Sequence, residues 1–269
     1  MTGHHPFALQ TLRPANVPAS ELSRDIVVEV PVALEYNGIG YTTLMATPDH
    51  FADLALGHAV AEGLVNSSDQ VEGPHAWPVD GGWIVRTTLP DAAREQIFTR
   101  ARKRVSDSSC GLCGVENIAE ALRPIPKSAR PASPSRAALW RALADLGQHQ
   151  SLNRLTGAAH AAAFCGLDGQ IVMIREDVGR HSAFDKLIGA CLAAQIDMTR
   201  GFALLSARCS YELVEKAVRG GVAMLVTISA PTSLAIERAR AADLTLICLA
   251  RPDASLLVHD PYNLFSERT

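Results

Sequence analysis

The chain has 269 residues, of which 48% are hydrophobic and 20% are charged, so it can bury a sizeable core and is not intrinsically disordered. Its formal net charge of −3 and its pI near 6.3 exclude the strongly basic surface of a general nucleic-acid-binding protein. This length is comfortable for two domains.

The N-terminal residues contain no visible targeting signal. Met1-Thr2-Gly3-His4-His5-Pro6 lacks the charged and apolar regions of a signal peptide, and no apolar run has the length of a membrane span. Six cysteines without a secretion signal indicate thiols that are kept reduced. We therefore expect a cytoplasmic protein that binds no nucleic acid and no membrane.

The first segments predict an antiparallel meander. Residues 1–24 are polar and contain proline, which indicates a loosely held arm. A strand rich in valine and isoleucine is expected from Ile26 to Tyr36. The dipeptide Asn37-Gly38 is a hairpin signal, and it precedes a second expected strand from Tyr41 to Ala46.

A helix should follow this hairpin. Thr47 is its expected N-cap, with proline at the first helical position, and the helix should end near Glu62. His58 lies beside the apolar stripe of this helix, and we interpret it as a packed histidine rather than a ligand. A strand over 82–89 and a helix over 91–104 complete the first half of the chain.

Two thiols stand three residues apart in the stretch Ser108-Ser109-Cys110-Gly111-Leu112-Cys113-Gly114. The glycines permit positive φ, which predicts a mobile loop. The basic run 100–104 precedes the loop, and a helix-forming segment follows it. Cations and a helix N-terminus both favour thiolate over thiol, so the loop is suited to present a reactive sulfur. The alternative for the basic run is that it only ends a helix.

Other uses of this pair of cysteines are less well supported. A structural zinc site usually needs a second CxxC or an HxxxH, and the chain has neither, so we expect no bound metal. A thioredoxin-type dithiol would follow an apolar strand, whereas a charged segment precedes this loop. The remaining cysteines are isolated in apolar surroundings and should be small core residues: Cys165, Cys191, Cys209 and Cys248.

The second half of the chain changes in character. Residues 124–134 hold four prolines and predict a linker, after which Ser135 should cap a helix to about Gln148. Apolar strands then alternate with helices, which is the pattern of an α/β layered sheet with parallel crossovers. The expected strands are 160–164, 171–174, 202–206, 223–229 and 245–249, and the expected helices are 182–194, 211–219 and 234–242.

Unusual polar residues follow these strands. Ligands of open α/β sheets bind outside the carboxyl ends of the strands, so we expect one site there for phosphate and a polar base. Its candidate residues are His160, Arg175, Arg180, His181, Arg208, Ser229, Thr232, Arg251, Pro252 and Asp253. The alternative is a structural network in which Glu176 and Asp177 pair with Arg175 and Arg180.

These motifs together resemble the FdhD/NarQ family. The matching blocks span roughly residues 26 to 251, and the SSCGLCG loop combined with the REDVGRH run is far more specific than either alone. The blocks are 31–34 with 37–38, 45–48, 62–63, 108–114, 156–157 with 160–163, 175–181 with 185–186, and 229–232 with 234–235. The chain departs from the family pattern at Ala158, Ser182, Ala207 and Asp243, three of which replace glycine.

The resemblance implies an α/β fold with two domains. Residues 1–124 would form an N-terminal α+β domain with the CxxC loop, and residues 135–269 a C-terminal, cytidine-deaminase-like three-layer domain. The deaminase HxE and PCxxC signature is absent, so zinc-dependent deamination is not supported. The resemblance also implies a homodimer.

The implied function is sulfur transfer. Family members are understood to accept persulfide sulfur from a cysteine desulfurase on the CxxC loop, which here is Cys110 and Cys113, with Cys110 expected to bear the sulfur. They pass it to the molybdenum or tungsten of a bis-molybdopterin guanine dinucleotide cofactor that formate dehydrogenase requires. GDP would be a convenient probe for one end of this cofactor. The alternative is a chaperone that delivers the cofactor without transferring sulfur.

Overall fold

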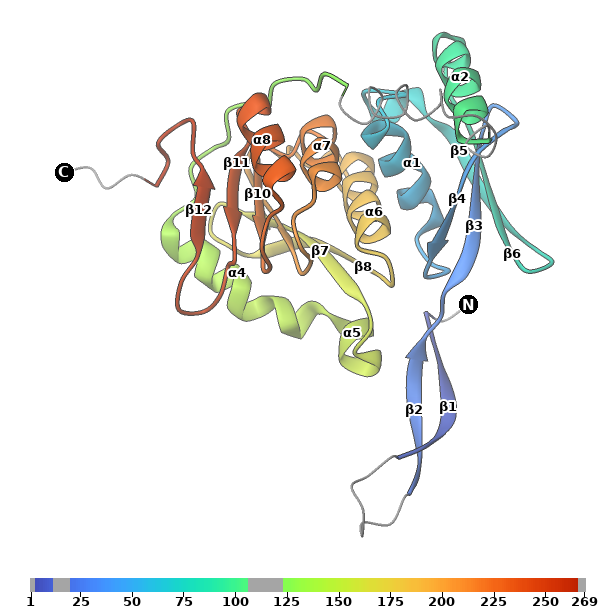
Figure 1. The fold of residues 1–269 in the computed structure, drawn as a ribbon, viewed down its shortest axis with the longest axis horizontal. Coiled ribbons are helices and arrows are strands. Elements are labelled where there is room, and N and C mark those ends of the chain that lie inside the picture. Colours follow the sequence, from blue (N-terminus) through green and yellow to red (C-terminus); the bar gives the residue numbers. More distant parts are fainter. Residues whose placement is uncertain (1–2, 12–19, 106–122, 266–269) are drawn as a thin grey trace.

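The computed structural model describes residues 3–11, 20–105 and 123–265. Three β-sheets organise this part of the chain (Figure 1). The first is a two-stranded antiparallel hairpin of β1 (His4–Gln10) and β2 (Glu21–Val27), which extends away from the body. The residues at 1–24 were expected to be a loose arm, and their described part is instead a β-ribbon.

The second sheet has four strands in the order β4-β3-β6-β5. They are β3 (Val30–Tyr36), β4 (Ile39–Ala46), β5 (Glu72–Val79) and β6 (Gly82–Thr88). The turn between β3 and β4 has φ of 53° at Asn37 and 75° at Gly38, which confirms the hairpin signal. The strand expected over 26–36 is wrong as one element, because the chain breaks between β2 and β3.

Helices cover one face and one end of this sheet. They are α1 (Phe51–Ala61), the short helix η1 (Ser68–Gln70), a turn η2 (Asp91–Ala93) and α2 (Arg94–Val105). The expectation that Thr47 caps α1 is wrong. The N-cap is His50, in the left-handed conformation, and Thr47 bonds the C-terminal half of the chain instead.

The third sheet has six strands in the order β12-β11-β10-β9-β7-β8. They are β7 (His160–Gly166), β8 (Ile171–Asp177), β9 (Gly201–Leu205), β10 (Met224–Thr227), β11 (Thr245–Cys248) and β12 (Leu256–His259). The three strands β9, β10 and β11 are parallel and wholly buried, as expected when helices lie on both faces.

Helices form a layer on each side of the six-stranded sheet. On one face lie α6 (Arg180–Ala193), α7 (Tyr211–Arg219) and α8 (Ser233–Ala242), and on the other lies α4 (Arg136–His149), followed by the short α5 (Ser151–Thr156). Ser135 caps α4 as expected, accepting from Ala138 N. The result is a mixed α/β fold, with α5, β5 and β12 unforeseen from the sequence.

The two larger sheets are joined through a pair of packed helices. In Figure 1, α1 lies between the four-stranded sheet and α6. Glycines allow this close approach: a Cβ at Gly57 would lie 1.8 Å from Asp185 O, and one at Gly189 would lie 1.9 Å from Asp53 O. The proline-rich segment after residue 123 runs along the outside of the C-terminal half. Its Ser128 N donates to Ala242 O, and its Ala132 N donates to Thr199 O. Within the residues described, no helix is long and apolar enough to span a bilayer.

Candidate functional site

The carboxyl ends of four strands meet at one edge of the six-stranded sheet. The parallel strands β9, β10 and β11 end there, and β8 runs in the same direction because β7 is antiparallel to both β8 and β9. His160 begins β7 opposite Asp177 and so lies at the same edge. The chain therefore brings most of the expected site residues to this side of the sheet, which we call the carboxyl edge: His160, Arg180, His181, Arg208, Ser229, Thr232, Arg251, Pro252 and Asp253.

The beginning of α6 supplies the densest group of basic side chains at the carboxyl edge. Arg180 and His181 are its first two residues, and His181 Nε2 lies 3.2 Å from Glu212 Oε2 of α7. Burial, followed by the charges of Lys216 and Arg180, lowers the pKa of His181 to about 4. Burial and Arg180 likewise lower the pKa of His160. Both imidazoles are therefore neutral at pH 7, beside two fixed cations.

Arg180 is the arginine at the carboxyl edge whose buried Nε makes no hydrogen bond within the described part of the chain. The Nε atoms of Arg123, Arg219 and Arg238 share this feature elsewhere in the described residues. A buried guanidinium N–H without a partner is costly, and an anion at the N-terminus of α6 would relieve it. Neutral histidines can then donate to, or be protonated beside, such an anion. This group suits a phosphate or diphosphate better than a cation.

The loops after β9, β10 and β11 are linked by backbone hydrogen bonds. Cys209 N donates to Ala230 O, and Thr232 N donates to Cys209 O at 2.9 Å. Thr232 is the N-cap of α8, where its hydroxyl accepts from Ala235 N. Arg208 and the segment 251–253 are exposed. This edge thus presents two helix N-termini, α6 and α8, with exposed arginines beside them.

Arg175 does not belong to this group. It was expected to follow its strand, but it lies inside β8, and its Nε donates to Asp53 Oδ2 of α1 at 2.8 Å. The alternative network expected at this motif is also wrong in its pairing. Glu176 instead accepts from Leu152 N and Asn153 N at the start of α5.

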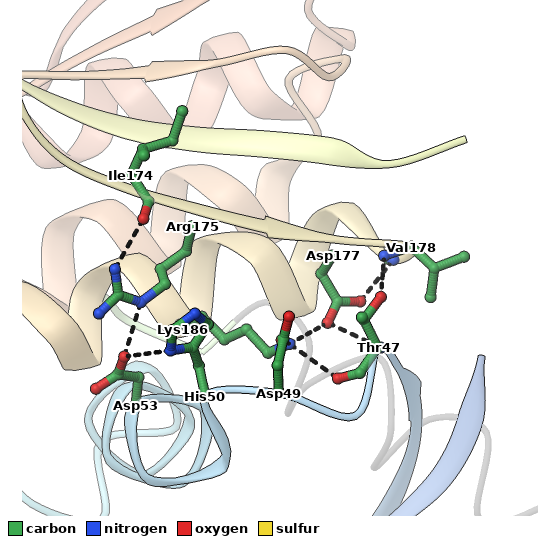
Figure 2. Close-up of polar contacts among 10 residues, drawn as sticks. Thr47, Asp49, His50, Asp53, Ile174, Arg175, Asp177, Val178 and Lys186 are labelled. Carbon is green, nitrogen blue, oxygen red and sulfur yellow. Dashed lines mark hydrogen bonds and ion pairs between the residues drawn. The ribbon is translucent and has the colours of Figure 1, made fainter. Parts of the chain in front are cut away.

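Asp177 pairs with a lysine that sequence reasoning did not select. Lys186 Nζ of α6 lies 2.7 Å from Asp177 Oδ2, and both side chains are fully buried. The same ammonium donates to Thr47 O at 3.0 Å and to Asp49 Oδ1 at 2.5 Å (Figure 2). Burial raises the pKa of Asp177, and Lys186 opposes that rise. The sequence signals for this lysine were a charged pair, Asp185-Lys186, in the apolar part of a helix and the grouping of 185–186 with 175–181 in the resemblance.

Further bonds close this cluster around the two halves of the chain. Thr47 N donates to Asp177 Oδ2, and Val178 N donates to Thr47 Oγ1, each at 3.1 Å. Figure 2 shows the loop before α1 and the end of β8 facing each other across Lys186. We call Thr47, Asp49, Asp177 and Lys186 the junction cluster. It fixes the loop before α1 against the REDVGRH segment.

The cysteines divide into two groups. Cys110 and Cys113 lie outside the residues that the structure describes, so their role stays a prediction. The other four are fully buried, which confirms them as core residues. Burial raises the pKa values of Cys165 and Cys191 to about 12, so neither thiol has the thiolate character that sulfur transfer needs.

Three residues of this chain stand where the family pattern has glycine, and they differ in backbone conformation. Ala158 and Ala207 do not have positive φ, so alanine is unstrained there. Asp243 has φ 55° at the C-cap of α8, a conformation that glycine adopts more easily. The geometry of the carboxyl edge is therefore not distorted by the two alanines.

Comparisons with known proteins agree over nearly the whole chain. The model of the FdhD/NarQ family matches residues 27–264. A Sulfur carrier protein FdhD from Bordetella petrii is 38% identical over 253 residues, covering 94% of this chain and 91% of the relative. One from Chromobacterium violaceum is 43% identical over 229 residues, covering 84% and 85%.

A solved structure is similar in fold. It is a protein from Desulfotalea psychrophila assigned as a formate dehydrogenase accessory protein, with a TM-score of 0.75 and 17% identity. The alignment covers 97% of this chain and 98% of that one. At this identity the likeness concerns the fold alone.

Proposed function

The chain belongs to the FdhD/NarQ family, and from that membership we propose that it is a sulfur carrier in the maturation of a formate dehydrogenase. It takes persulfide sulfur from a cysteine desulfurase and delivers it to a bis-molybdopterin guanine dinucleotide cofactor holding molybdenum or tungsten. The cofactor is the substrate of this reaction, and the homodimer is the working form.

Loading is a transfer between two thiols. The Cys110 thiolate attacks the outer sulfur of the desulfurase persulfide, the sulfur–sulfur bond of that persulfide breaks, and the desulfurase leaves as a thiolate. Cys110 then carries the outer sulfur as its own persulfide. The rate depends on the thiolate fraction of Cys110 and on access to it.

Release uses the second cysteine. The Cys113 thiolate attacks the inner sulfur of the Cys110 persulfide, so that a Cys110–Cys113 disulfide forms and hydrosulfide leaves toward the metal. The transferred sulfur gains the electron pair, and the two cysteines are oxidised. A thiol reductant must restore them before the next cycle.

The observation that carries the substrate side of this proposal is the carboxyl edge. Arg180 has a buried Nε without a partner among the described residues, at the start of α6 and beside the two neutral histidines. Guanidinium groups donate paired hydrogen bonds to phosphates, and helix N-termini favour anions. Arg208, Ser229, Thr232, Arg251, Pro252 and Asp253 extend this surface toward a nucleotide base.

The experiment is mass spectrometry of the protein after incubation with a cysteine desulfurase and cysteine. Wild type should gain one sulfur that reductant removes, and Cys110→Ala should gain none. Cys113→Ala should load normally but keep its sulfur, since it lacks the attacking thiol for release. Sulfur found on Cys165 or Cys209 would contradict the assignment.

A cofactor-delivery chaperone is the second candidate, because the carboxyl edge contains no element that requires a reactive thiol. The Cys110→Ala, Cys113→Ala double variant separates the two. If that variant still activates formate dehydrogenase in cells, delivery without sulfur transfer is the function. Sulfur transfer requires that activation be lost while GDP binding persists.

A further inference from the structure

A cavity lies beside the free edge of β8, away from the group at the start of α6. Its volume is about 270 Å³. β8 is the outermost strand of its sheet, and the other walls come from the start of β1, the loop before α1 and the corner between α4 and α5. Nothing in the proposed sulfur transfer uses this cavity.

One wall presents a guanidinium held in a fixed position. Arg175 Nε is bonded to Asp53, and its Nη1 donates to Ile174 O at 2.8 Å (Figure 2). Its Nη2 has no recorded partner in the part of the chain that the structure describes. These two bonds hold the guanidinium in place and leave Nη2 as its unbonded donor, and guanidinium groups donate readily to carboxylates.

Another wall presents a carboxylate with one bonded and one unbonded oxygen. Asp49 Oδ1 accepts a hydrogen bond from the Lys186 ammonium of the junction cluster. Its Oδ2 makes no recorded hydrogen bond to the residues described, and the side chain is 32% exposed. The cavity therefore combines an oriented guanidinium with an oriented carboxylate that keeps one oxygen unbonded, whereas its second carboxylate, Glu176, is bonded to the start of α5.

His50 stands between these two walls. It has φ 48° and ψ 40°, a left-handed conformation that is strained for a residue other than glycine. Such strain is concentrated at functional sites. Its Nδ1 lies 3.8 Å from Asp53 Oδ2, and its side chain is 48% exposed. Burial and the charge of Arg175 lower its pKa, so it serves as a neutral hydrogen-bonding group.

The remaining lining is mixed, with an apolar part beside polar side chains that include His4, His149 and Ser151. Leu152, Leu155 and Ile174 face the cavity, and Leu155 is 50% exposed. Among the described residues no three His, Cys, Asp or Glu side chains are arranged to hold a metal ion, so the cavity histidines do not make a metal site. A simple anion would meet Asp49 and Glu176, and a simple amine would meet Arg175.

We propose that this cavity binds a free α-amino acid. The ligand carboxylate bonds Arg175 Nη2, its ammonium bonds Asp49 Oδ2, and its aliphatic side chain packs on Leu152 and Leu155. The volume is just below the range of about 300–1,000 Å³ that is common for drug-sized ligands, so a smaller molecule with both charges fits. The bound ligand would bridge the loop before α1 and β8, at the junction of the two halves.

The test compares three compounds by calorimetry on the full chain. L-Leucine carries both charges, isocaproate lacks the amine and isopentylamine lacks the carboxylate. Loss of one charge-assisted bond should weaken binding roughly tenfold or more, so leucine should bind best. Equal binding of leucine and either single-charge compound overturns the proposal, and so does an absence of leucine binding at millimolar concentrations.

Two variants locate the site. Asp49→Asn should remove the preference for leucine over isocaproate. Leu155→Trp should fill the cavity and abolish leucine binding without touching the buried charges, which keeps the test valid if Asp49→Asn fails to fold. Asp197→Asn, an exposed carboxylate elsewhere, is the matched control and should bind as wild type does. Unchanged binding in the folded Leu155→Trp variant overturns the location.

Discussion

Arg180 and His181 show how a few residues at one helix start set the chemistry of the carboxyl edge. Arg180 carries a buried Nε–H without a partner among the described residues, and His181 is kept neutral by burial and by neighbouring cations. A group arranged in this way is costly for the free protein and favourable once an anion arrives. Both residues can therefore be tested directly.

Removal of the Arg180 guanidinium should weaken nucleotide binding. A charge-assisted hydrogen bond contributes about 1.5–3 kcal/mol, so Arg180→Ala should raise the dissociation constant of GDP by roughly tenfold or more. Arg208→Ala should act in the same direction. Calorimetric titration of folded variants measures this, with Arg200→Ala as control because Arg200 lies just before β9, at the opposite edge of the sheet. Equal affinities in all four proteins would place the nucleotide elsewhere.

His181 should make the fold sensitive to acid. Its folded pKa of about 4 lies below its unfolded value of 6.5, so the unfolded chain binds more protons between these values. The free energy of unfolding should fall as pH falls through this window, by at most about 2 kcal/mol between pH 7 and pH 5. Urea denaturation at both pH values measures the fall, which His181→Gln should reduce. His149→Gln, at an exposed histidine, should leave it unchanged.

At the scale of elements, the contact of α1 with α6 depends on two glycines. Each lies against a carbonyl oxygen of the other helix, with no room for a methyl group. This contact decides how the four-stranded sheet sits against the α/β layer. The junction cluster then fastens the loop before α1 to the end of β8.

Gly189→Ala should separate the two helices. An added Cβ would lie 1.9 Å from Asp53 O. Overpacking a core typically lowers the free energy of unfolding by about 1–3 kcal/mol. Because the obstacle here is backbone, we expect a loss of about 3 kcal/mol or more. Gly147→Ala in α4 is the control, because a Cβ there meets nothing within 4 Å and should stabilise the helix by up to about 1 kcal/mol. Thermal or urea unfolding of both variants measures the change in stability, which should be a decrease for Gly189→Ala and an increase for Gly147→Ala.

Lys186→Met should be more damaging than the loss of a surface lysine. It would leave the buried Asp177 carboxylate without its cation, and a broken buried pair typically costs about 3–5 kcal/mol. Lys127→Ala removes an exposed pair with Asp243 and should cost no more than about 1 kcal/mol. Urea denaturation measures the free energy of unfolding of both variants. Similar decreases in the two variants would contradict this role of Lys186.

At the scale of the whole molecule, the hydrophobic cores separate along the chain. One cluster involves residues 32–97, and two others, on opposite faces of the six-stranded sheet, involve residues 139–265. The division into domains 1–124 and 135–269 stays a prediction. The β1–β2 ribbon stands apart from all three cores, and Phe7, Leu9 and Leu22 on its one face are 40–49% exposed.

The expected homodimer can be tested at this scale. An isolated two-stranded ribbon is marginally stable, and an exposed apolar face favours association. Light scattering should give the mass of a dimer at micromolar concentration, and Phe7→Ser with Leu22→Ser should shift it toward the monomer. Val172→Ser, at an exposed apolar residue outside the ribbon, is the control. A monomeric wild type would contradict the prediction.

Local sequence patterns were sufficient to predict part of this fold. Apolar alternation placed the strands and helices of the second half, Asn37-Gly38 placed a turn, and Ser135 placed a helix start. The motif residues were also expected at one edge of the sheet, and most of these candidates lie there, since parallel strands bring their carboxyl ends to one edge whatever the details of packing. The CxxC loop remains a prediction from the sequence alone.

The bonding partners of the charged residues, in contrast, could not be predicted from local sequence. Arg175, Glu176 and Asp177 are consecutive, yet they bond three different elements: α1, α5 and Lys186 of α6. Thr47 likewise resembles a helix cap in sequence but bonds Val178, 131 positions away. Pairings of this kind depend on which surfaces meet after the sheets and helices have packed. Local propensity reflects only neighbouring residues, so it cannot predict contacts between residues that are far apart in the sequence.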